Sequence, residues 1–332
     1  MRLVFCGTPQ FAVPALRHLL EQADMQIAAV ITQPDRPRGR GQEISFSPVK
    51  KTALEAGILI HQPQKIRAPE SQQLLEALAP EVIVIIAYGQ IIPARLLAIP
   101  KLGWINLHAS LLPKYRGAAP INWAIVNGEV SSGLSTMRID AGMDTGDILL
   151  QEELSIGASE TAPELAERMS EAGAPLMAKT LRALAAETLR PRPQNHDLAS
   201  AAPLLKKEDG RIDWKRSAQE IFNRIRGLAP WPGTSTTFRG QNCQIWGQPF
   251  AGSRSAPPLA EQTSPPAREQ IPGTIISAPN IIGTGSDHPN WLVICGHTTL
   301  LRLSAVKLEG RKQISASEFA NGVRLASGDH FQ

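Results

Sequence analysis

The sequence predicts an α/β protein with two domains, in which a mostly parallel β-sheet covered by helices on both faces precedes a smaller β-barrel. Its 332 residues are too many for one ordinary domain and suit two. In the first two-thirds of the chain, short apolar strands alternate with helical segments, which is typical of a parallel sheet. In the last third, short strands follow one another closely, as in small barrels.

The first predicted domain begins with an apolar strand, and the turn Gly7-Thr8-Pro9 separates it from an amphipathic segment. Ser47 and Pro48 begin a helix that Gly57 ends. The run VIVIIA is typical of a fully buried strand. In chain order, this part is predicted to contain a strand at 1–6, a helix at 11–20, a strand at 27–32, helices at 47–55 and 69–79, and strands at 82–87 and 104–108.

The pattern changes after the strand at 104–108. Two longer apolar segments predict a β-hairpin, a helix follows, and a Pro-, Asn- and Ala-rich stretch then has the composition of a linker. We therefore predict a first domain at 1–189, a linker at 190–206 and a second domain at 207–332. The remaining predicted elements are strands at 134–139 and 146–154, helices at 160–189 and 217–226, and strands at 234–238, 243–247, 273–277, 291–295 and 299–306.

Composition excludes several classes of protein. The chain is 42% hydrophobic and 19% charged, which indicates a globular protein. No apolar run approaches the roughly 18–20 residues that cross a membrane, and the first residues lack the apolar core of a secretory signal, so we expect a cytoplasmic protein. Cys6, Cys243 and Cys295 form no C-x-x-C pair, which argues against a disulfide framework and a metal site. Each cysteine is predicted to be buried.

Polar side chains collect where the strand at 104–108 ends. Asn106 and His108 are two residues apart on an extended chain, so their side chains point the same way. Ligands of doubly wound sheets bind at the carboxyl edge of such strands. Downstream, Asp140 and Asp144 lie in a glycine-rich loop of the predicted hairpin. The structure of such a loop does not require two acidic residues, although Asp is a common turn residue.

An Asn, a His and an Asp together suit acyl transfer from an amide-like donor to an amine. The tetrahedral intermediate carries an oxyanion that an Asn amide and a His can stabilise, and an Asp can orient the His or relay protons. No activated Ser or Cys is required, so the amine can attack directly. The alternative from spacing alone is an Asn and a His that hydrogen-bond to loop backbone.

The segment NLHASLLPKYRGAAP resembles the signature of the 10-formyltetrahydrofolate-dependent formyltransferases. The resemblance assigns the family's catalytic trio to Asn106, His108 and Asp144. It also implies a Rossmann-like formyltransferase domain followed by an OB-like barrel, with 10-formyltetrahydrofolate as formyl donor and no metal. The family's S-L-L-P turn lines the folate site, and it corresponds here to Ser110, Leu111, Leu112 and Pro113.

Three further segments, FCGTPQFAVPALRHLL, ITQPDRPRGRG and LAPWPGT, resemble the members of the family that formylate methionine on initiator tRNA. The loop at 34–49 carries Arg36, Arg38 and Arg40 among prolines and glycines. By composition alone, a mobile solvated loop is the better interpretation. The resemblance implies instead that this loop wedges into the acceptor end of the tRNA, where the three arginines contact it.

Charge is distributed unevenly along the chain. Residues 1–205 hold 19 basic and 20 acidic residues, whereas residues 206–332 hold 15 basic and 10 acidic ones. The second domain is therefore the better candidate to meet a polyanion, although a solvated basic face is the simpler interpretation. Given the resemblance, we expect its OB-like barrel to contact tRNA phosphates, with Lys206 and Lys207 among the contacts. The expected partners are initiator methionyl-tRNA and the folate donor. We expect no association with a membrane, and we expect a monomer.

Three other functions compete with this one. A formyltransferase acting on an amino sugar nucleotide would share the N-x-H-x-S-L-L-P segment but should lack the GTPQFA start and the arginine loop, and both are present. A hydrolase would use water in place of the amine and often has an added regulatory domain. A non-catalytic tRNA-binding protein would not need to keep Asn106, His108 and Asp144 together.

Overall fold

The chain divides into two compact units in the computed structural model, which describes residues 1–38, 43–250, 271–278 and 290–332. Unit 1 consists of Met1–Trp123 and Val130–Leu204, and unit 2 of Ala124–Glu129 and Leu205–Gln332. The chain thus passes from unit 1 to unit 2 after Leu204. A short piece of the first two-thirds, Ala124–Glu129, belongs to unit 2.

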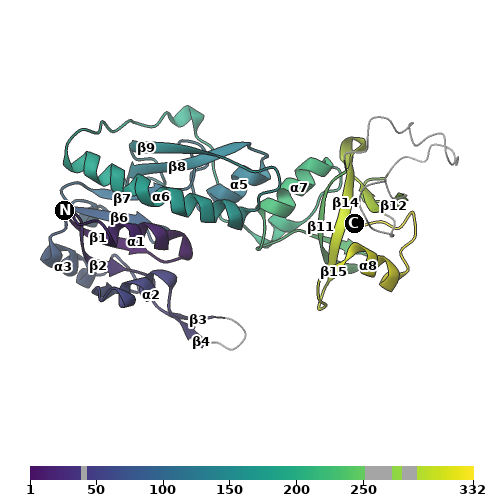
Figure 1. Cartoon of the computed structure of the whole chain (residues 1–332), viewed down its shortest axis with the longest axis horizontal. Coiled ribbons are helices and arrows are strands. Elements are labelled where there is room, and N and C mark those ends of the chain that lie inside the picture. Colours follow the sequence, from purple (N-terminus) through teal and green to yellow (C-terminus); the bar gives the residue numbers. More distant parts are fainter. Residues whose placement is uncertain (39–42, 251–270, 279–289) are drawn as a thin grey trace. The chain divides into compact units, whose positions relative to one another are not determined.

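Unit 1 is built on a sheet of seven strands in the order β5-β2-β1-β6-β7-β8-β9 (Figure 1). The first five strands in this order run parallel to one another, and β8 and β9 continue the sheet as an antiparallel hairpin. The mostly parallel sheet and the hairpin at its end confirm the predicted fold class. The strands are β1 (Arg2–Gly7), β2 (Gln26–Ile31), β5 (Ile60–His61), β6 (Val82–Ile86), β7 (Trp104–His108), β8 (Ser131–Arg138) and β9 (Ile148–Ser155).

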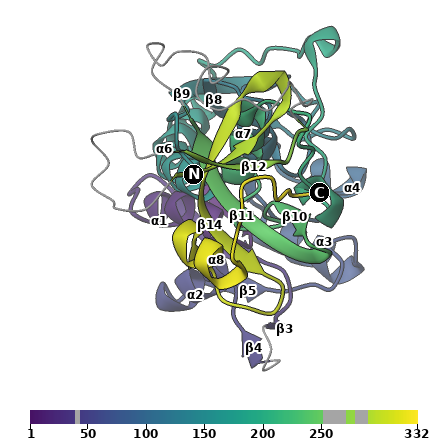
Figure 2. The ribbon, with the colours of Figure 1, turned by 90° about the vertical axis from the view of Figure 1, so that its right-hand side faces the viewer.

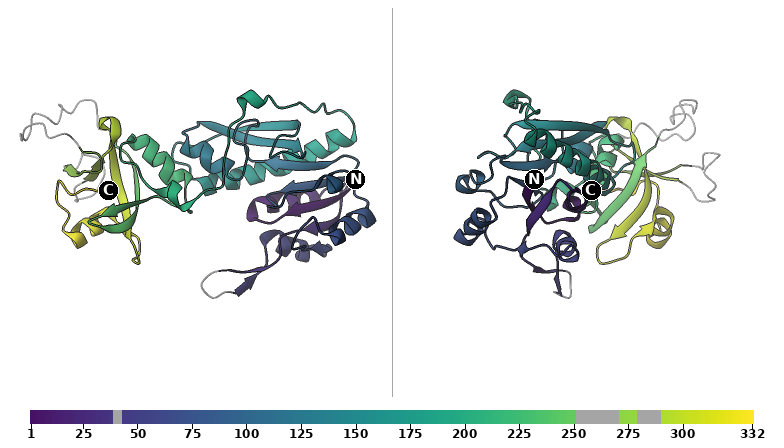
Figure 3. Two further views of the ribbon diagram at one scale, coloured as in Figure 1. Left: turned by 180° about the vertical axis from the view of Figure 1, so that it is seen from behind. Right: turned by 60° about the vertical axis from the view of Figure 1, so that its left-hand side comes forward.

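Helices pack on both faces of this sheet (Figures 1 and 3). On one face α1 contacts α6, whose Thr180 hydroxyl hydrogen-bonds Thr136 of β8. On the other, Leu75 of α3 and Leu96 of α4 join an apolar cluster with side chains of β1, β2, β6 and β7. The helices that lie wholly in unit 1 are α1 (Val13–Leu20), α2 (Pro48–Glu55), α3 (Pro69–Leu78), α4 (Ala94–Leu97) and α6 (Ala162–Ala185), and a 3-10 turn, η1 (Gln10–Ala12), precedes α1. Helix α5 (Pro120–Val126) begins in unit 1 and ends in unit 2.

Local sequence explains why these elements form. All five residues of β6, VIVII, are buried, and β-branched side chains suit a central strand that is covered on both faces. Helix α6 begins after Thr161, whose backbone N–H and hydroxyl both donate to the Glu164 carboxylate. Those two hydrogen bonds hold the pKa of Glu164 below its ordinary value.

The loop at 34–49 contains a short antiparallel hairpin, formed by β3 (Arg36–Arg38) and β4 (Glu43–Ser45), that stands out from the rest of unit 1 (Figure 3). Arg36 is exposed, and of Arg38 only the backbone is described. Arg40 lies outside the described residues.

Unit 2 is a predominantly antiparallel sheet in the order β10-β11-β14-β13-β12, with β15 paired to β14. His330 bridges to Thr274, and Phe331 bridges to Phe238, so the C-terminal residues join the two edges of the sheet. Helix α8 lies against β14 (Figure 2). The elements are α7 (Ala218–Gly227), β10 (Ser235–Phe238), β11 (Gln241–Pro249), β12 (Ile275–Ala278), β13 (Asn290–Ile294), β14 (Leu300–Leu308), β15 (Ile314–Ser315) and α8 (Ala316–Val323), with 3-10 turns η2 (His196–Leu198) before the unit and η3 (Lys207–Gly210) and η4 (Gly296–Thr298) within it.

An aromatic cluster fills the core of unit 2. The Trp214 and Phe331 rings stack with centroids 5.5 Å apart, and Phe319 meets Phe238 edge-on at 5.1 Å.

The three cysteines are free and buried, and burial raises the pKa of Cys243 and of Cys295 to about 12. Among the described residues, no helix is both long and apolar enough to cross a membrane.

Candidate active site

The polar residues predicted from the sequence lie at the carboxyl end of β7. His108 is the last residue of the strand and pairs with Ser135 of β8, and Asn106 pairs with Met137. Because the two residues are two apart on one strand, their side chains extend from the same face of the sheet. His108 is buried and Asn106 is half-buried. The Asn106 amide makes no hydrogen bond within the described part of the chain, so its donors remain available to a ligand.

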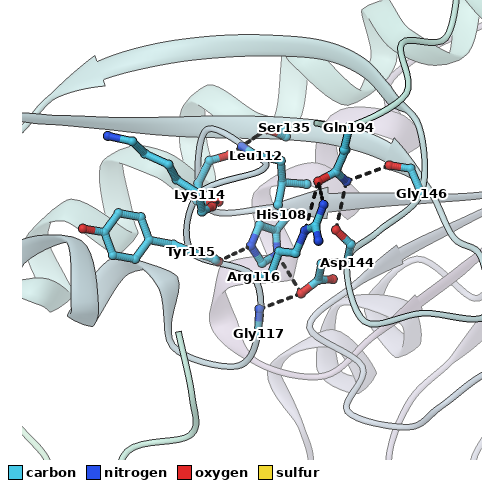
Figure 4. Close-up of polar contacts among 11 residues, drawn as sticks. His108, Leu112, Lys114, Tyr115, Arg116, Gly117, Ser135, Asp144, Gly146 and Gln194 are labelled. Atoms are coloured by element: carbon cyan, nitrogen blue, oxygen red, sulfur yellow. Dashed lines mark hydrogen bonds and ion pairs between the residues drawn. The ribbon is translucent and has the colours of Figure 1, made fainter. Parts of the chain in front are cut away.

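One hydrogen bond of His108 defines which ring nitrogen carries a proton. Its Nε2 lies 2.8 Å from the carbonyl oxygen of Tyr115 (Figure 4). Since a carbonyl only accepts, Nε2 is the donor. Nδ1 lies 3.6 Å from Oδ2 of Asp144, too far for a hydrogen bond but close enough for an ion pair. Nδ1 is therefore the ring nitrogen left to interact with reacting atoms.

Both residues that contact the imidazole have left-handed backbones. Tyr115 has a φ of 59° and Asp144 a φ of 53°. Such values are uncommon outside glycine and indicate strain that the surrounding structure holds in place. The Asp144 carboxylate also accepts a 2.8 Å hydrogen bond from the backbone N–H of Gly117. A β-carbon on Gly117 would lie 2.6 Å from the carbonyl oxygen of Ala202, so only glycine fits where this donor reaches the carboxylate.

Residues 190–204 of the predicted linker at 190–206 belong to unit 1, and several of them contact the active site. Residues 200–202 pair with Arg116 through backbone hydrogen bonds in both directions. The Ser200 hydroxyl accepts a hydrogen bond from the N–H of Tyr115. The buried Gln194 side chain hydrogen-bonds to Arg116, Asp144 and Gly146 (Figure 4). Sequence reasoning missed Gln194, because one glutamine in a polar, proline-rich stretch carries no periodicity or motif of its own.

The turn Ser110-Leu111-Leu112-Pro113 begins two residues after His108 and is held by hydrogen bonds to the residues around it. The buried Ser110 hydroxyl donates to the Lys114 carbonyl, and the Ser135 hydroxyl donates to the Ser110 carbonyl. Gln151 donates to the carbonyl of Leu112. Leu111 and Pro113 are half-buried, so they are the side chains of the turn that remain accessible, while Ser110 and Leu112 support it from within.

The arginine-bearing hairpin is anchored at its base. Lys50 forms a short ion pair with Asp35, and Gln62 donates to Asp35 at 3.1 Å. Burial disfavours the Asp35 carboxylate, but these donors and the Lys50 charge hold the pKa of Asp35 below its ordinary value. Gln33 in turn donates to the carbonyl of Tyr88, just beyond β6. The base of the hairpin is thus tied to the carboxyl edge of the sheet, and Arg40 lies outside the described residues.

The remaining predicted tRNA contacts, Lys206 and Lys207, lie at the start of unit 2, and both are exposed. Asp140 accepts hydrogen bonds from Thr145 and Gly142 inside the β8–β9 loop and so serves that loop's structure. Over the residues that the structure covers, no group of three or more His, Cys, Asp or Glu side chains could hold a metal ion.

Comparison with known proteins decides the family. Residues 1–181 match the family described as formyl transferase, and residues 204–324 match its C-terminal domain. The chain belongs to the formyl transferase family. This formyl transferase is 48% identical over 330 residues, which is 99% of this chain and 98% of the relative, to a protein of Solibacter usitatus named methionyl-tRNA formyltransferase. It is 47% identical, over the same shares of both chains, to a Koribacter versatilis protein of that name.

Solved structures confirm the fold. One is an N-formyltransferase from Helicobacter canadensis in complex with folinic acid and dTDP-3-aminofucose, with a TM-score of 0.60, 20% identity, and coverage of 91% of this chain and 98% of that one. Another is WlaRD, a sugar 3N-formyl transferase in the presence of dTDP and 5-N-formyl-THF, with a TM-score of 0.59, 18% identity, and coverage of 94% and 99%.

Proposed function

We propose that this formyl transferase moves a formyl group from 10-formyltetrahydrofolate to the α-amino group of methionine on initiator methionyl-tRNA. The observation that carries the proposal is the identity of 48% over nearly the full length of a relative named methionyl-tRNA formyltransferase. The sugar formyltransferases are similar at 18–20% identity, which supports a shared fold and not a shared acceptor. The alternative acceptor, an amino sugar nucleotide, is therefore the one that the test must exclude.

The geometry around β7 supports direct attack by the amine. The lone pair of the methionine nitrogen forms a bond to the formyl carbon, and the carbonyl electrons move to the oxygen. The Asn106 amide can donate to that oxyanion, and the His108 side chain extends from the same face of β7. When both ring nitrogens of His108 are protonated, the Asp144 carboxylate at 3.6 Å balances the charge. Collapse then breaks the bond to the folate nitrogen, which takes up the proton that the amine loses.

The folate donor is proposed to bind at this edge of the sheet beside the Ser110-Leu111-Leu112-Pro113 turn. Two large apolar side chains are exposed on loops of unit 1: Ile91 after β6 is 89% exposed, and Met143 beside Asp144 is 72% exposed. Exposed apolar side chains beside polar ones are typical of ligand sites, and a flat heteroaromatic ring would cover apolar surface of this kind.

The tRNA is proposed to contact both the hairpin and unit 2. Arg36 and the backbone of Arg38 belong to the β3 strand of the hairpin, and Arg40 lies outside the described residues; we propose that all three arginines follow the acceptor end. Unit 2 has a cavity of about 550 Å³ whose lining includes Trp246, and three basic residues also line it: Lys307, Arg311 and Lys312. An aromatic ring beside several cations is a combination that binds single-stranded nucleic acid by stacking and charge. Lys206 and Lys207 add exposed positive charge to unit 2.

Purified protein given labelled 10-formyltetrahydrofolate and three acceptors in parallel tests the proposal. The acceptors are charged initiator methionyl-tRNA, charged elongator methionyl-tRNA and an amino sugar nucleotide. We expect label on methionine from the initiator tRNA, much less from the elongator, and none on the sugar. Transfer to the sugar alone would assign the chain to the competing class, and release of free formate without any acceptor would indicate a hydrolase. We also propose a monomer located in the cytoplasm; light scattering checks the first point and cell fractionation the second.

A further inference from the structure

Gln194 uses both ends of its side-chain amide at the active site. Its Oε1 accepts hydrogen bonds from Nε and Nη2 of Arg116, at 3.1 and 2.7 Å. Its Nε2 donates to the carbonyl oxygens of Asp144 and Gly146, at 2.9 and 2.7 Å (Figure 4). The residue is only 7% exposed. An arginine only donates and a carbonyl only accepts, so these four partners determine the orientation of the amide.

These contacts hold Asp144 from two sides. The left-handed region is unfavourable for an L-residue, and the Asp144 side chain does not offset that cost by bonding its own loop, because its carboxylate faces Gly117 and His108. The Gln194 amide binds the backbone carbonyl of that strained residue. At the same time its oxygen holds Arg116, and the next residue, Gly117, donates to the Asp144 carboxylate. One side chain therefore connects the backbone of Asp144 with the segment that binds its carboxylate.

The second residue that contacts His108 is held by the same segment. Tyr115, which accepts the Nε2 hydrogen bond, is also left-handed, and its N–H is bound by the Ser200 hydroxyl. Thus the stretch 194–202, which composition alone marks as a linker, contacts both residues that fix the imidazole. A connection that served only to join two domains would not need a buried amide with four partners at a catalytic carboxylate.

We propose that Gln194 is a positioning residue for formyl transfer, which keeps the Asp144 carboxylate beside Nδ1 of His108. This rests on the proposed function, since it assigns Gln194 to the same reaction. Without the Gln194 donors, the 143–146 loop would lose two hydrogen bonds, and the left-handed conformation of Asp144 could relax. A carboxylate displaced by about 1 Å is expected to slow the chemical step by about 100-fold.

Gln194→Met removes both ends of the amide at similar length, and Gln194→Glu keeps an acceptor for Arg116 while removing the donors to Asp144 and Gly146. We expect each to lower kcat by about 10- to 100-fold and to leave KM for either substrate within about threefold. Asn195→Ala is the matched control, because Asn195 is exposed and caps only a local turn through the N–H of Asp197. It should retain the wild-type kcat.

A double-mutant cycle separates positioning from a general structural role. If Gln194 acts through Asp144, adding Gln194→Met to Asp144→Asn should reduce kcat little further than Asp144→Asn alone. Reductions that multiply fully, or an unchanged kcat in both Gln194 variants, would overturn the proposal.

Hydrogen exchange of the Gly117 amide gives a readout that does not depend on activity. Its donor bond to Asp144 should open more often in both Gln194 variants and not in Asn195→Ala. If the wild-type protein formylates no methionyl-tRNA, the proposed function fails, whereas this exchange comparison still decides whether Gln194 positions Asp144. Unchanged Gly117 exchange in both Gln194 variants would refute the positioning role by itself.

Discussion

Replacing Gly117 by alanine is expected to slow formyl transfer because the new β-carbon would displace a donor to Asp144. That β-carbon would lie 2.6 Å from the carbonyl oxygen of Ala202, whereas ordinary contact begins at 3.4 Å, so the two must separate by about 0.8 Å. The Gly117 N–H lies 2.8 Å from the Asp144 carboxylate. A movement of that size along this bond would stretch it to about 3.6 Å, which is no longer a hydrogen bond.

The loss should appear in both rate and stability. Gly117 has a φ of 122°, so alanine there adds backbone strain of about 1–2 kcal/mol to the free energy of folding. Displacement of the Asp144 carboxylate should lower the single-turnover rate of formyl transfer by about 10- to 100-fold. Rapid-quench kinetics with excess enzyme measures the rate, and thermal unfolding measures the stability.

Gly57→Ala is the control for strain without displacement. Gly57 also has a positive φ, of 65°, but a β-carbon there meets nothing within 4 Å, and the residue follows α2 instead of contacting the active site. This variant should lose similar stability and keep the wild-type rate. If Gly117→Ala also kept the wild-type rate while both variants lost stability, the Gly117–Asp144 hydrogen bond would have no part in the chemistry, and the reasoning would be wrong.

Three other predictions concern the hairpin and unit 2. The pKa of Asp35 is held low, so its pair with Lys50 should stabilise the fold fully above the ordinary value of 3.8 and lose that effect as the pH falls through the lower, folded value. The difference in unfolding free energy between wild type and Asp35→Asn should therefore shrink between about pH 5 and pH 2. Replacing Arg38 and Arg40 with alanine should slow formylation of initiator tRNA while KM for the folate donor stays unchanged. Unaltered discrimination between initiator and elongator tRNA would count against a role of the hairpin in tRNA recognition. Binding of tRNA should weaken steeply with salt, and Lys312→Ala should reduce the slope of log K against log salt by about 1; an affinity insensitive to salt would exclude phosphate contacts.

Local pattern was sufficient to predict the parts of the fold that depend on short stretches of chain. The Val/Ile run of β6 and the spacing of Asn106 and His108 on β7 follow from side-chain alternation and burial, and both are found as expected. Asp144 was predicted through a motif resemblance, and the structure brings it to 3.6 Å from His108. Its left-handed backbone was not predictable, since nothing local requires it.

The parts that were not predicted depend on contacts between distant residues. Gln194 lies 50 residues after Asp144 and 78 after Arg116, and no local pattern records such contacts. The ion pair between Asp35 and Lys50 was likewise not predicted. It fixes the base of a hairpin in a segment whose composition is typical of a mobile loop. Sequence composition reports the solvent preference of a segment, whereas these roles arise from hydrogen bonds that form only in the folded chain.

The most direct test of the central claim is the product of a single turnover. Wild type and Asp144→Asn, each in excess over charged initiator methionyl-tRNA, are mixed with 10-formyltetrahydrofolate, and the amino acid released from the tRNA is identified by mass spectrometry over time. We predict formylmethionine from wild type, and the same product from Asp144→Asn at a rate lower by about 100-fold or more. Methionine that remains unformylated with wild type, or equal rates for both proteins, would contradict the account.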